Sequence, residues 1–465
     1  MNHGDSRMDL VREAFHYQSR FSGSTMVFKI DFPVTLDPAF PSLMKDLALL
    51  ARTGFRVVIV PGAKEWIDSV LAEYGIVSAY LQPDAVSAEP GEGAAPESRY
   101  MPKVPLRITG ERAMPLVEMA AFHVATRFVT ALSANRCDAL VGNFLRARGL
   151  GVLAGRDMEN TGRAEKILVK PMRKVLELGM VPVLPCIGWG PSGKPYNVPS
   201  GEIALAAAAA LGAVKLFVVS GRVLRAGALA LPPGVETGEG RIIRLTPGEA
   251  EAVLELNAGG AGSDPASGGA ELLADLALAL AASRAGVERV HLVDGREDGA
   301  VLRELFSNLG SGTMVYADEY EAIRPLQTAD IPDVLRIMEP LMRRGILVRR
   351  GPEDIQEKKT DYHVFGVDGR VHACGALHRW GNDGEIAALA VDGPYADLGL
   401  GSRVVRFLMS KAAREGMRRV FALTTKTQDW FEALGFREGG VDALPEERRK
   451  SYNSDRNSKI YLREL

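Results

Sequence analysis

The chain has 465 residues, of which 46% are hydrophobic, 25% charged and 7% aromatic, a composition typical of a globular protein of about two or three domains. The net charge of −2 argues against a nucleic-acid-binding or membrane-surface protein. Three widely separated cysteines build neither a disulfide framework nor a zinc cluster, so we expect a reducing, cytoplasmic location.

The sequence shows no export or membrane-spanning pattern. The N-terminal residues MNHGDSRMDLVREAFHYQSR are charged and lack the apolar segment of a secretory signal. The longest apolar stretch, Ile203–Val219, is interrupted by Gly212 and Lys215 and is shorter than the roughly 20 residues that cross a bilayer. It predicts an alanine-rich buried helix ended by Gly212, followed by a strand at Lys215–Val219.

Helical and extended patterns alternate from Met26 to about Val315, which predicts an α/β domain with a mostly parallel sheet covered by helices. A helical pattern stops at Gly54, and the β-branched run Arg56–Val60 then predicts a buried strand. Later strands are expected at Lys215–Val219, Val290–Val293 and Thr313–Val315.

A second unit with α+β order begins near Glu321. Ala322–Leu326 predicts its first strand, and an antiparallel hairpin is expected to turn at residues 368–369. A strand at Glu385–Val391 then leads through a glycine turn into an amphipathic helix, Ser402–Arg414. We therefore expect an N-terminal arm over residues 1–24, a first domain over 25–317 and a second over 322–465.

The glycine turn between that strand and that helix is the most informative motif. Gly399 and Gly401 leave backbone N–H groups bare at a helix N-terminus, where the partial positive charge favours a diphosphate. A glycine pair alone is weak evidence for such a site, because a plain strand-to-helix turn is the more common reason for it. The order of strand, Pro394-Tyr395, glycine turn and amphipathic helix, however, resembles the acetyl-CoA site of the GNAT acyltransferase superfamily.

This resemblance implies a GNAT fold with acetyl-CoA as co-substrate. It also implies that the fourth strand diverges from its neighbour to pair with the pantetheine amide. Ala396 stands where the superfamily usually has Arg or Gln, a departure that bears on the contacts of the loop. The implied cofactor-binding residues are Leu389, Ala390, Val391, Asp397, Gly399, Leu400, Gly401 and Ser402.

Two further segments carry a resemblance that extends over nearly the whole chain. Residues 444–459, LPEERRKSYNSDRNSK, and residues 345–350, GILVRR, are similar to the acetyltransferase domain of the bacterial N-acetylglutamate synthase family. The preceding region resembles the amino-acid kinase domain fused to it in that family. The resemblance implies acetyl transfer to the α-amine of L-glutamate, the first step of arginine biosynthesis, without a metal. A homo-oligomer is the expected assembly.

Glutamate has two carboxylates and an ammonium group, so its pocket needs cations and a proton acceptor. The residues that match the family's glutamate site are Arg349, Arg456 and Ser458, with Leu347 beside them, and Arg448 or Arg449 is expected to supply a third cation. Glu385 matches the general base, although a carboxylate that merely begins a strand is the alternative. Backbone N–H groups near Leu389–Val391 are expected to stabilise the oxyanion, and Thr424 or Thr425 to protonate the thiolate.

Other reactive side chains of the second unit are expected to be structural. Cys374 has no adjacent base in the sequence and is interpreted as a core cysteine rather than an acyl-accepting nucleophile. The histidines of the same hairpin, His363, His372 and His378, lack a carboxylate at metal-ligand spacing and are interpreted as surface or packing residues.

The first domain departs from the amino-acid kinase pattern at its phosphate site. Asp31 and Phe32 place an anion and bulk where kinases have glycines after the first-strand lysine, here Lys29, and Gly201 stands where they have an aspartate. We therefore expect no phosphoryl transfer, and the resemblance implies L-arginine as an effector. Its implied site residues are Tyr17, Lys215, His291, Glu304, Gly310 and Gly312.

Three alternatives remain at this point. The chain is also compatible with a bifunctional synthase and kinase, with a GNAT enzyme for another amine, or with an arginine-binding regulator that has an inactive transferase domain.

Overall fold

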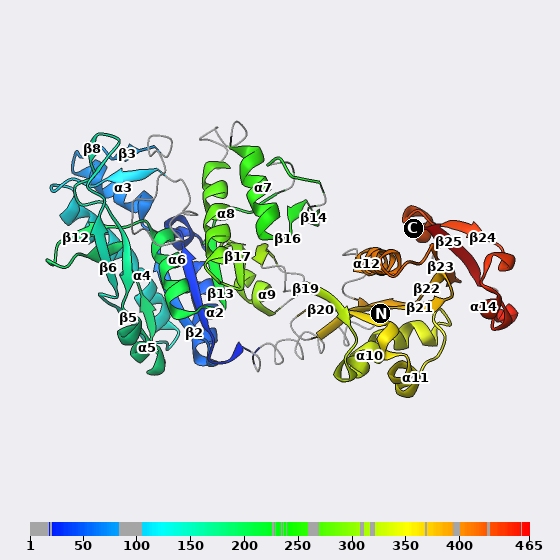
Figure 1. The fold of residues 1–465 in the computed structure, drawn as a ribbon. Coiled ribbons are helices and arrows are strands. Elements are labelled where there is room, and N and C mark those ends of the chain that lie inside the picture. Colours follow the sequence, from blue (N-terminus) through cyan, green and yellow to red (C-terminus); the bar gives the residue numbers. More distant parts are fainter. Residues whose placement is uncertain are drawn as a thin grey trace. The chain divides into compact units, whose positions relative to one another are not determined.

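Two units make up the chain, Met1–Ala317 and Asp318–Leu465. They are seen in a computed structural model (Figure 1), which describes residues 18, 21–82, 105–225, 227, 229–233, 235, 237–238, 240–258, 269–306, 311–316, 321–367, 370–393, 400–425, 428–456 and 458–465. No helix among these residues is long and apolar enough to cross a membrane.

An eight-stranded sheet forms the centre of the first unit, in the order β16-β18-β17-β13-β1-β2-β10-β5. Neighbouring strands are parallel except β17 and β18. The strands are β1 (Thr25–Ile30), β2 (Arg56–Pro61), β5 (Ala139–Val141), β10 (Val181–Val183), β13 (Lys215–Ser220), β16 (Arg244–Leu245), β17 (Arg289–Asp294) and β18 (Thr313–Tyr316). This confirms the α/β expectation and the strands predicted from β-branched runs.

Helices cover this sheet. They are α2 (Phe40–Arg52), α3 (Lys64–Glu73), α4 (Met114–Ala134), α5 (Val169–Glu177), α6 (Ser200–Leu211), α7 (Pro247–Asn257), α8 (Gly269–Arg284) and α9 (Ala300–Phe306). Helices α6 and α8 pack side by side against the central strands, whereas α2 contacts both α4 and α9. The predicted alanine-rich helix is α6, and it ends at Gly212 in the left-handed conformation, φ 63°, as expected.

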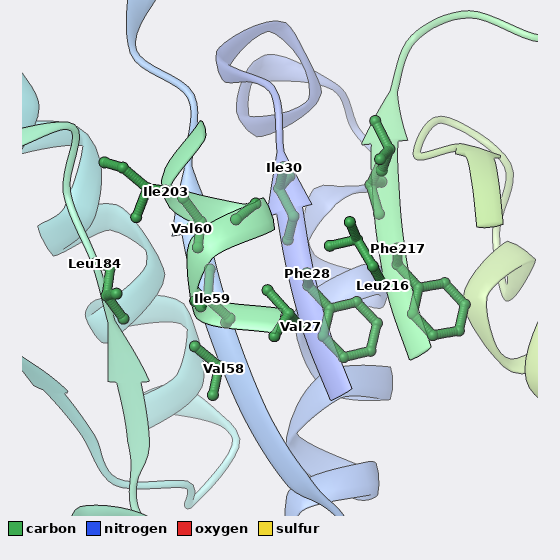
Figure 2. Close-up of a cluster of buried hydrophobic side chains, with 14 of the residues drawn as sticks. Val27, Phe28, Ile30, Val58, Ile59, Val60, Leu184, Ile203, Leu216 and Phe217 are labelled. Carbon is green, nitrogen blue, oxygen red and sulfur yellow. The ribbon is translucent and has the colours of Figure 1, made fainter. Parts of the chain in front are cut away.

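Burial on both faces explains why the central strands have continuous apolar runs. Every residue of β1, β13 and β17 is buried. Figure 2 shows part of the core on the faces of the sheet around β1, with Val27 and Phe28 of β1 near Ile59 of β2 and Phe217 of β13. The charged residues on these strands are therefore exceptions to a hydrophobic interior and must be held by partners.

Smaller elements complete the first unit. A four-stranded sheet has the order β12-β11-β6-β9, formed by β6 (Leu145–Gly149), β9 (Gly162–Ile167), β11 (Ile187–Trp189) and β12 (Pro195–Asn197). Three two-stranded sheets pair β3 (Ala79–Leu81) with β4 (Leu106–Ile108), β7 (Val152–Leu153) with β8 (Arg156–Asp157), and β14 (Thr237–Gly238) with β15 (Arg241–Ile242).

The second unit has a seven-stranded sheet in the order β19-β20-β21-β22-β23-β25-β24, antiparallel except between β22 and β23. The strands are β19 (Glu321–Pro325), β20 (Tyr362–Val367), β21 (Arg370–Trp380), β22 (Asp383–Val391), β23 (Arg419–Thr424), β24 (Arg437–Gly439) and β25 (Lys459–Glu464). Its helices are α10 (Ile331–Arg343), α11 (Pro352–Glu357), α12 (Leu400–Arg414), α13 (Gln428–Ala433) and α14 (Glu446–Lys450). The expected amphipathic helix is α12, which begins two residues before Ser402.

A β-bulge bends the central strand β22. Cys374 pairs with Ala390 and Ala376 with Ala387, so Ala388 and Leu389 together face only Gly375 on β21. Ala388 accordingly has φ +53°. Strand β22 pairs with β23 only over Asp383–Ile386, so its second half leaves that neighbour. This is the divergence that the GNAT resemblance implied.

Candidate functional site

Glu385 lies on β22 just before the strands diverge, and its side chain is held by two other residues. Arg448 of α14 donates from Nε to Oε2 (2.7 Å) and from Nη2 to Oε1 (2.9 Å). Trp380 of β21 donates from Nε1 to Oε2 (3.0 Å). Because each carboxylate oxygen accepts about two hydrogen bonds, Oε2 is filled and Oε1 keeps one acceptor position. The group is therefore an oriented carboxylate that can still accept a proton.

The segments predicted to bind the carboxylates of glutamate meet in the structure. Arg456 donates from Nη2 to the carbonyl oxygens of Gly345 (3.1 Å) and Ile346. These two residues begin the segment that continues with Leu347 and Arg349. Burial and the nearby charge of Arg350 lower the pKa of Arg456, which shows that like charges are concentrated here.

The predicted members of this region differ in exposure. The side chain of Arg349 is exposed and Leu347 is half-buried, whereas Ser458 is buried and its carbonyl oxygen accepts from the Tyr452 hydroxyl at 2.9 Å. Arg448, assigned to glutamate from the sequence, pairs with Glu385. Trp380 was missed, since only the register of β21 with β22 brings it to Glu385. Arg350 lies in the segment 345–350 that carries the resemblance, but no role was assigned to it from the sequence.

The second half of β22 and the start of α12 contain the described cofactor residues. Leu389, Ala390 and Val391 lie where β22 no longer pairs with β23, which leaves a backbone edge for hydrogen bonds to an amide-containing chain. Helix α12 begins at Leu400, and a Cβ on Gly401 would lie 3.3 Å from the Trp430 ring. Ser402 follows in the first turn, whereas Asp397 and Gly399 lie outside the described residues.

Three further side chains with reactive groups in this unit, those of Thr424, Thr425 and Cys374, differ in their burial. Thr424 is buried at the end of β23 and Thr425 follows it, half-buried. Cys374 is fully buried, and its thiol donates to the carbonyl oxygen of Ala388 (3.5 Å). Burial raises the pKa of the Cys374 thiol to about 12, so the thiolate that a nucleophile needs is not formed. Its interpretation as a core cysteine is confirmed.

In the first unit, Lys29 is clamped between two carboxylates. Its Nζ lies 2.7 Å from Asp31 Oδ1 and 3.1 Å from Oδ1 of Asp275 on α8, and Arg222 lies 3.2 Å from Asp31 Oδ2. Burial alone would lower the pKa of Lys29, but the two carboxylates raise it above its ordinary value. The cation that kinases offer to phosphate is therefore neutralised internally. Asp275, distant in sequence, was not anticipated.

The predicted effector residues His291 and Glu304 form a buried pair. His291 donates from Nδ1 to Glu304 Oε1 (2.8 Å), and Glu304 Oε2 accepts the N–H groups of Ser311 (2.7 Å) and Gly312 (2.9 Å). Burial and the charge of Lys215 lower the pKa of His291 to about 4, against the opposing effect of Glu304. Burial would raise the pKa of Glu304, but these hydrogen bonds lower it overall. The pair is thus neutral imidazole and carboxylate at neutral pH.

Two buried cations lie beside this pair. The Phe21 ring centroid is 5.3 Å from Lys215 Nζ and 5.5 Å from Arg289 Cζ. Lys215 pairs with Arg289 and Phe217 with His291 in the parallel register of β13 and β17, so the cations and the histidine share one face. Arg289 was not predicted from the sequence. Its position two residues before His291 on the same strand places both side chains on one face, and this spacing could have identified it. Tyr17 and Gly310 lie outside the described residues.

Family models match both units. The amino acid kinase family matches residues 21–294, and the acetyltransferase (GNAT) family matches residues 332–436. Together with the observed folds, these matches define an acetyltransferase in which an amino-acid kinase-like domain precedes a GNAT domain.

Curated relatives and solved structures match the full length. An amino-acid acetyltransferase of Neisseria meningitidis serogroup B is 32% identical over 466 residues, with 98% of this chain and 97% of the relative covered. One from Pseudomonas syringae pv. tomato is 31% identical, with 97% and 98% covered. The crystal structure of N-acetylglutamate synthase from Neisseria gonorrhoeae complexed with coenzyme A and L-arginine matches at TM-score 0.78 and 30% identity, covering 98% of this chain and 99% of that one. The chain therefore belongs to the amino-acid acetyltransferase family.

Proposed function

We propose that the chain transfers the acetyl group of acetyl-CoA to the α-amine of L-glutamate, and that L-arginine bound to the first unit regulates this reaction. The observation that carries the proposal is the placement of Glu385 at the point where β22 leaves β23, with cationic side chains on the neighbouring segments. The gonococcal relative was also crystallised with coenzyme A and N-acetyl-glutamate, which supports the product class. As the first step of arginine biosynthesis, the reaction would take place in the cytoplasm, in a homo-oligomer.

The residues present suit acetyl-CoA. The unpaired edge of Leu389–Val391 offers hydrogen bonds to the pantetheine amides, and the first N–H groups of α12 from Leu400 to Ser402 suit the diphosphate together with the glycine loop. When bound, acetyl-CoA supplies an acyl carbon activated as a thioester.

Glu385 accepts a proton from the substrate ammonium, so that the amine attacks the thioester carbonyl. Backbone N–H groups near Leu389–Val391 stabilise the oxyanion, and Thr424 or Thr425 protonates the departing thiolate. Arg349 and Arg456 hold the substrate carboxylates. Arg448 is the third anchor: as its guanidinium turns from Glu385 to a substrate carboxylate, the base becomes available when glutamate is in place.

For the effector, the charges of the first unit match free arginine. The Glu304 carboxylate suits a guanidinium, and Lys215 with Arg289 suits the carboxylate at the other end of the ligand. Phe21 lies over both cations, so the segment that carries it is placed to respond to an anion bound there.

A thiol-release assay with acetyl-CoA and a panel of amino acids and amines tests the proposed reaction. We expect turnover with L-glutamate well above that with every other acceptor. Preference for another amine would identify a different GNAT enzyme, and no turnover with any acceptor would favour the arginine-binding regulator. Acyl-phosphate formation from ATP and N-acetylglutamate, which the clamped Lys29 argues against, would instead reveal a bifunctional enzyme.

A further inference from the structure

His378 stands directly across the sheet from Glu385. The two residues are partners in the antiparallel pairing of β21 with β22, and the register is regular from Leu377 to Trp380. Side chains at paired positions project from the same face, with Cβ atoms about 4.5–5.5 Å apart. His378 and Glu385, the carboxylate to which the proposed reaction delivers a proton, therefore extend from neighbouring positions on one face of the sheet.

Asp361 fixes the orientation and tautomer of the His378 imidazole. Its Oδ2 is 2.6 Å from His378 Nδ1. Because an ionised carboxylate has no proton to donate, the tautomer of the neutral imidazole that fits this contact has its hydrogen on Nδ1 and its acceptor at Nε2. The Tyr362 ring and the same imidazole form a T-shaped pair, with the ring centroids 6.2 Å apart. The Asp361 carboxylate therefore orients the His378 imidazole in the way that a third group orients a catalytic base. Tyr362 restricts the same ring by packing against it.

The reaction needs a route by which a proton leaves Glu385. Forming an amide from an ammonium removes two protons from the nitrogen, of which the thiol keeps one, so each turnover releases one proton to solvent. The side chain of Glu385 is only 9% exposed and lies beneath Arg448 and Trp380. The side chains of His378 and Asp361 are 15% and 34% exposed, so the pair leads outward from Glu385.

We propose that the Asp361–His378 pair is a proton relay between Glu385 and solvent. The O–H bond of protonated Glu385 breaks as an N–H bond forms at His378 Nε2, directly or across one water molecule. The imidazolium, stabilised by Asp361, then releases the Nε2 proton to solvent and returns to its starting tautomer. The inference rests on the proposed function, because Glu385 must first act as the base. The charged and titratable groups around the imidazole are Asp361, Glu385 with its partner Arg448, and Tyr362.

Replacement of His378 tests the relay in the full-length enzyme. In His378→Ala we expect kcat to fall by about 10²-fold in dilute buffer, the lower end of the effect of general acid–base groups, with both KM values unchanged. Added imidazole should restore kcat in proportion to its concentration, since it carries the proton in place of the side chain. A purely structural role would not make turnover depend on buffer concentration. Asp361→Asn should lower kcat to a smaller extent, because it loosens the tautomer but leaves the imidazole.

Controls separate the relay from changes in folding and from the proposed function. Arg379→Gln alters the next residue of β21, whose side chain is exposed, and should keep the wild-type rate. Thermal unfolding of His378→Ala and His378→Gln shows which of the two variants folds, and the kinetic test can be made with either variant that does. A folded variant with the wild-type kcat and no buffer dependence would overturn the relay and leave the acetyltransferase function standing. A wild-type enzyme inactive with glutamate would overturn the proposed function itself and, with it, the relay.

Discussion

At the scale of single residues, the partners of each buried carboxylate decide what it can do. Glu385 is held by Arg448 and Trp380 and retains one acceptor position, which suits a base that must be released by its substrate. Glu304 accepts from His291 on Oε1 and from two backbone N–H groups on Oε2, so it organises the turn at residues 311–312 and also keeps one acceptor position on Oε1. Glu202 has a single backbone donor and is strongly desolvated, which favours its neutral form.

Removal of the charge at Glu385 tests its role as the base. Glu385→Gln keeps an oxygen for the Trp380 N–H but cannot take up a proton, so we expect the chemical step to slow by roughly 10²–10⁴-fold with nearly unchanged acetyl-CoA affinity. Rapid-mixing measurements of thiol release check the rate. Cys374→Ala is the control and should remain active without an acetyl-cysteine intermediate. An unchanged rate in Glu385→Gln would remove the assignment.

Glu202 of α6 gives a pH-dependent prediction for stability. Burial raises its pKa to about 7, whereas the ordinary value is 4.5. The unfolded chain therefore loses this proton at lower pH than the folded chain, and stability is lost as pH rises from about 4.5 to 7. Glu202→Gln, which still accepts the Ala164 N–H, should be more stable than wild type at pH 8 by on the order of 1–3 kcal/mol, with the difference shrinking toward pH 5.

Calorimetric unfolding of the full chain at several pH values measures this difference. The neighbour Glu165 provides the matched control, because Glu165→Gln makes the same chemical change at an exposed position. A pH-independent effect of Glu202→Gln would show that Glu202 is ionised in the folded protein.

At the scale of elements, the bulge in β22 creates the open edge of the transferase unit. Two residues of β22 face the single residue Gly375, and a Cβ at that glycine would come within 2.9 Å of Val404 on α12. The bulge therefore needs a small residue opposite it and a positive φ at Ala388. This local geometry, rather than the glycine loop alone, separates β22 from β23 where the cofactor is proposed to bind.

Substitutions at Ala388 test the importance of the bulge. Valine is β-branched and strained at φ +53°, at a cost of about 1–3 kcal/mol, so Ala388→Val should disturb the open edge and raise the KM for acetyl-CoA roughly 10-fold. Ala388→Gly accepts this φ without strain and should stay within about twofold of wild type. Steady-state kinetics compare the two variants. Equal KM values would show that the bulge does not shape the cofactor site.

At the scale of the whole molecule, a kinase-like unit with a neutralised lysine accompanies a transferase unit. The Lys29, Asp31 and Asp275 cluster satisfies its own charges. The region of Lys215, Arg289 and Glu304 contains buried groups of both charge signs, which suit the two ends of free arginine. We infer that the first unit serves regulation. For such regulation, arginine must favour one state of the enzyme over another, with a typical coupling of about 1–3 kcal/mol.

Lys215→Met tests this coupling. Methionine keeps much of the volume beneath Phe21 but removes the cation for the arginine carboxylate, so arginine affinity should fall at least 10-fold while the basal acetyl transfer persists. Titration calorimetry and the rate with and without arginine measure both effects. Glu304→Ala should also abolish the response, but it additionally unpairs the N–H groups of Ser311 and Gly312.

Lys194→Met is the control for Lys215→Met, since that lysine is exposed and lies between β11 and β12 of the four-stranded sheet rather than on a central strand. No arginine binding by the wild-type protein at millimolar ligand would end the effector proposal. Binding without any change in rate would reduce the first unit to a scaffold.

The sequence by itself determined the succession of an α/β and an α+β unit, the buried central strands, the helix ended by Gly212 and the family of the chain. These features depend on hydrophobic period, glycine placement and local motifs, which neighbouring residues specify. Only the tertiary structure decided which charged groups meet. Lys29 and Asp275 are 246 positions apart, and Glu385 and Arg448 are 63 apart. The meeting of such residues depends on strand register, the bulge and the return path of the chain, and no local pattern encodes these long-range contacts.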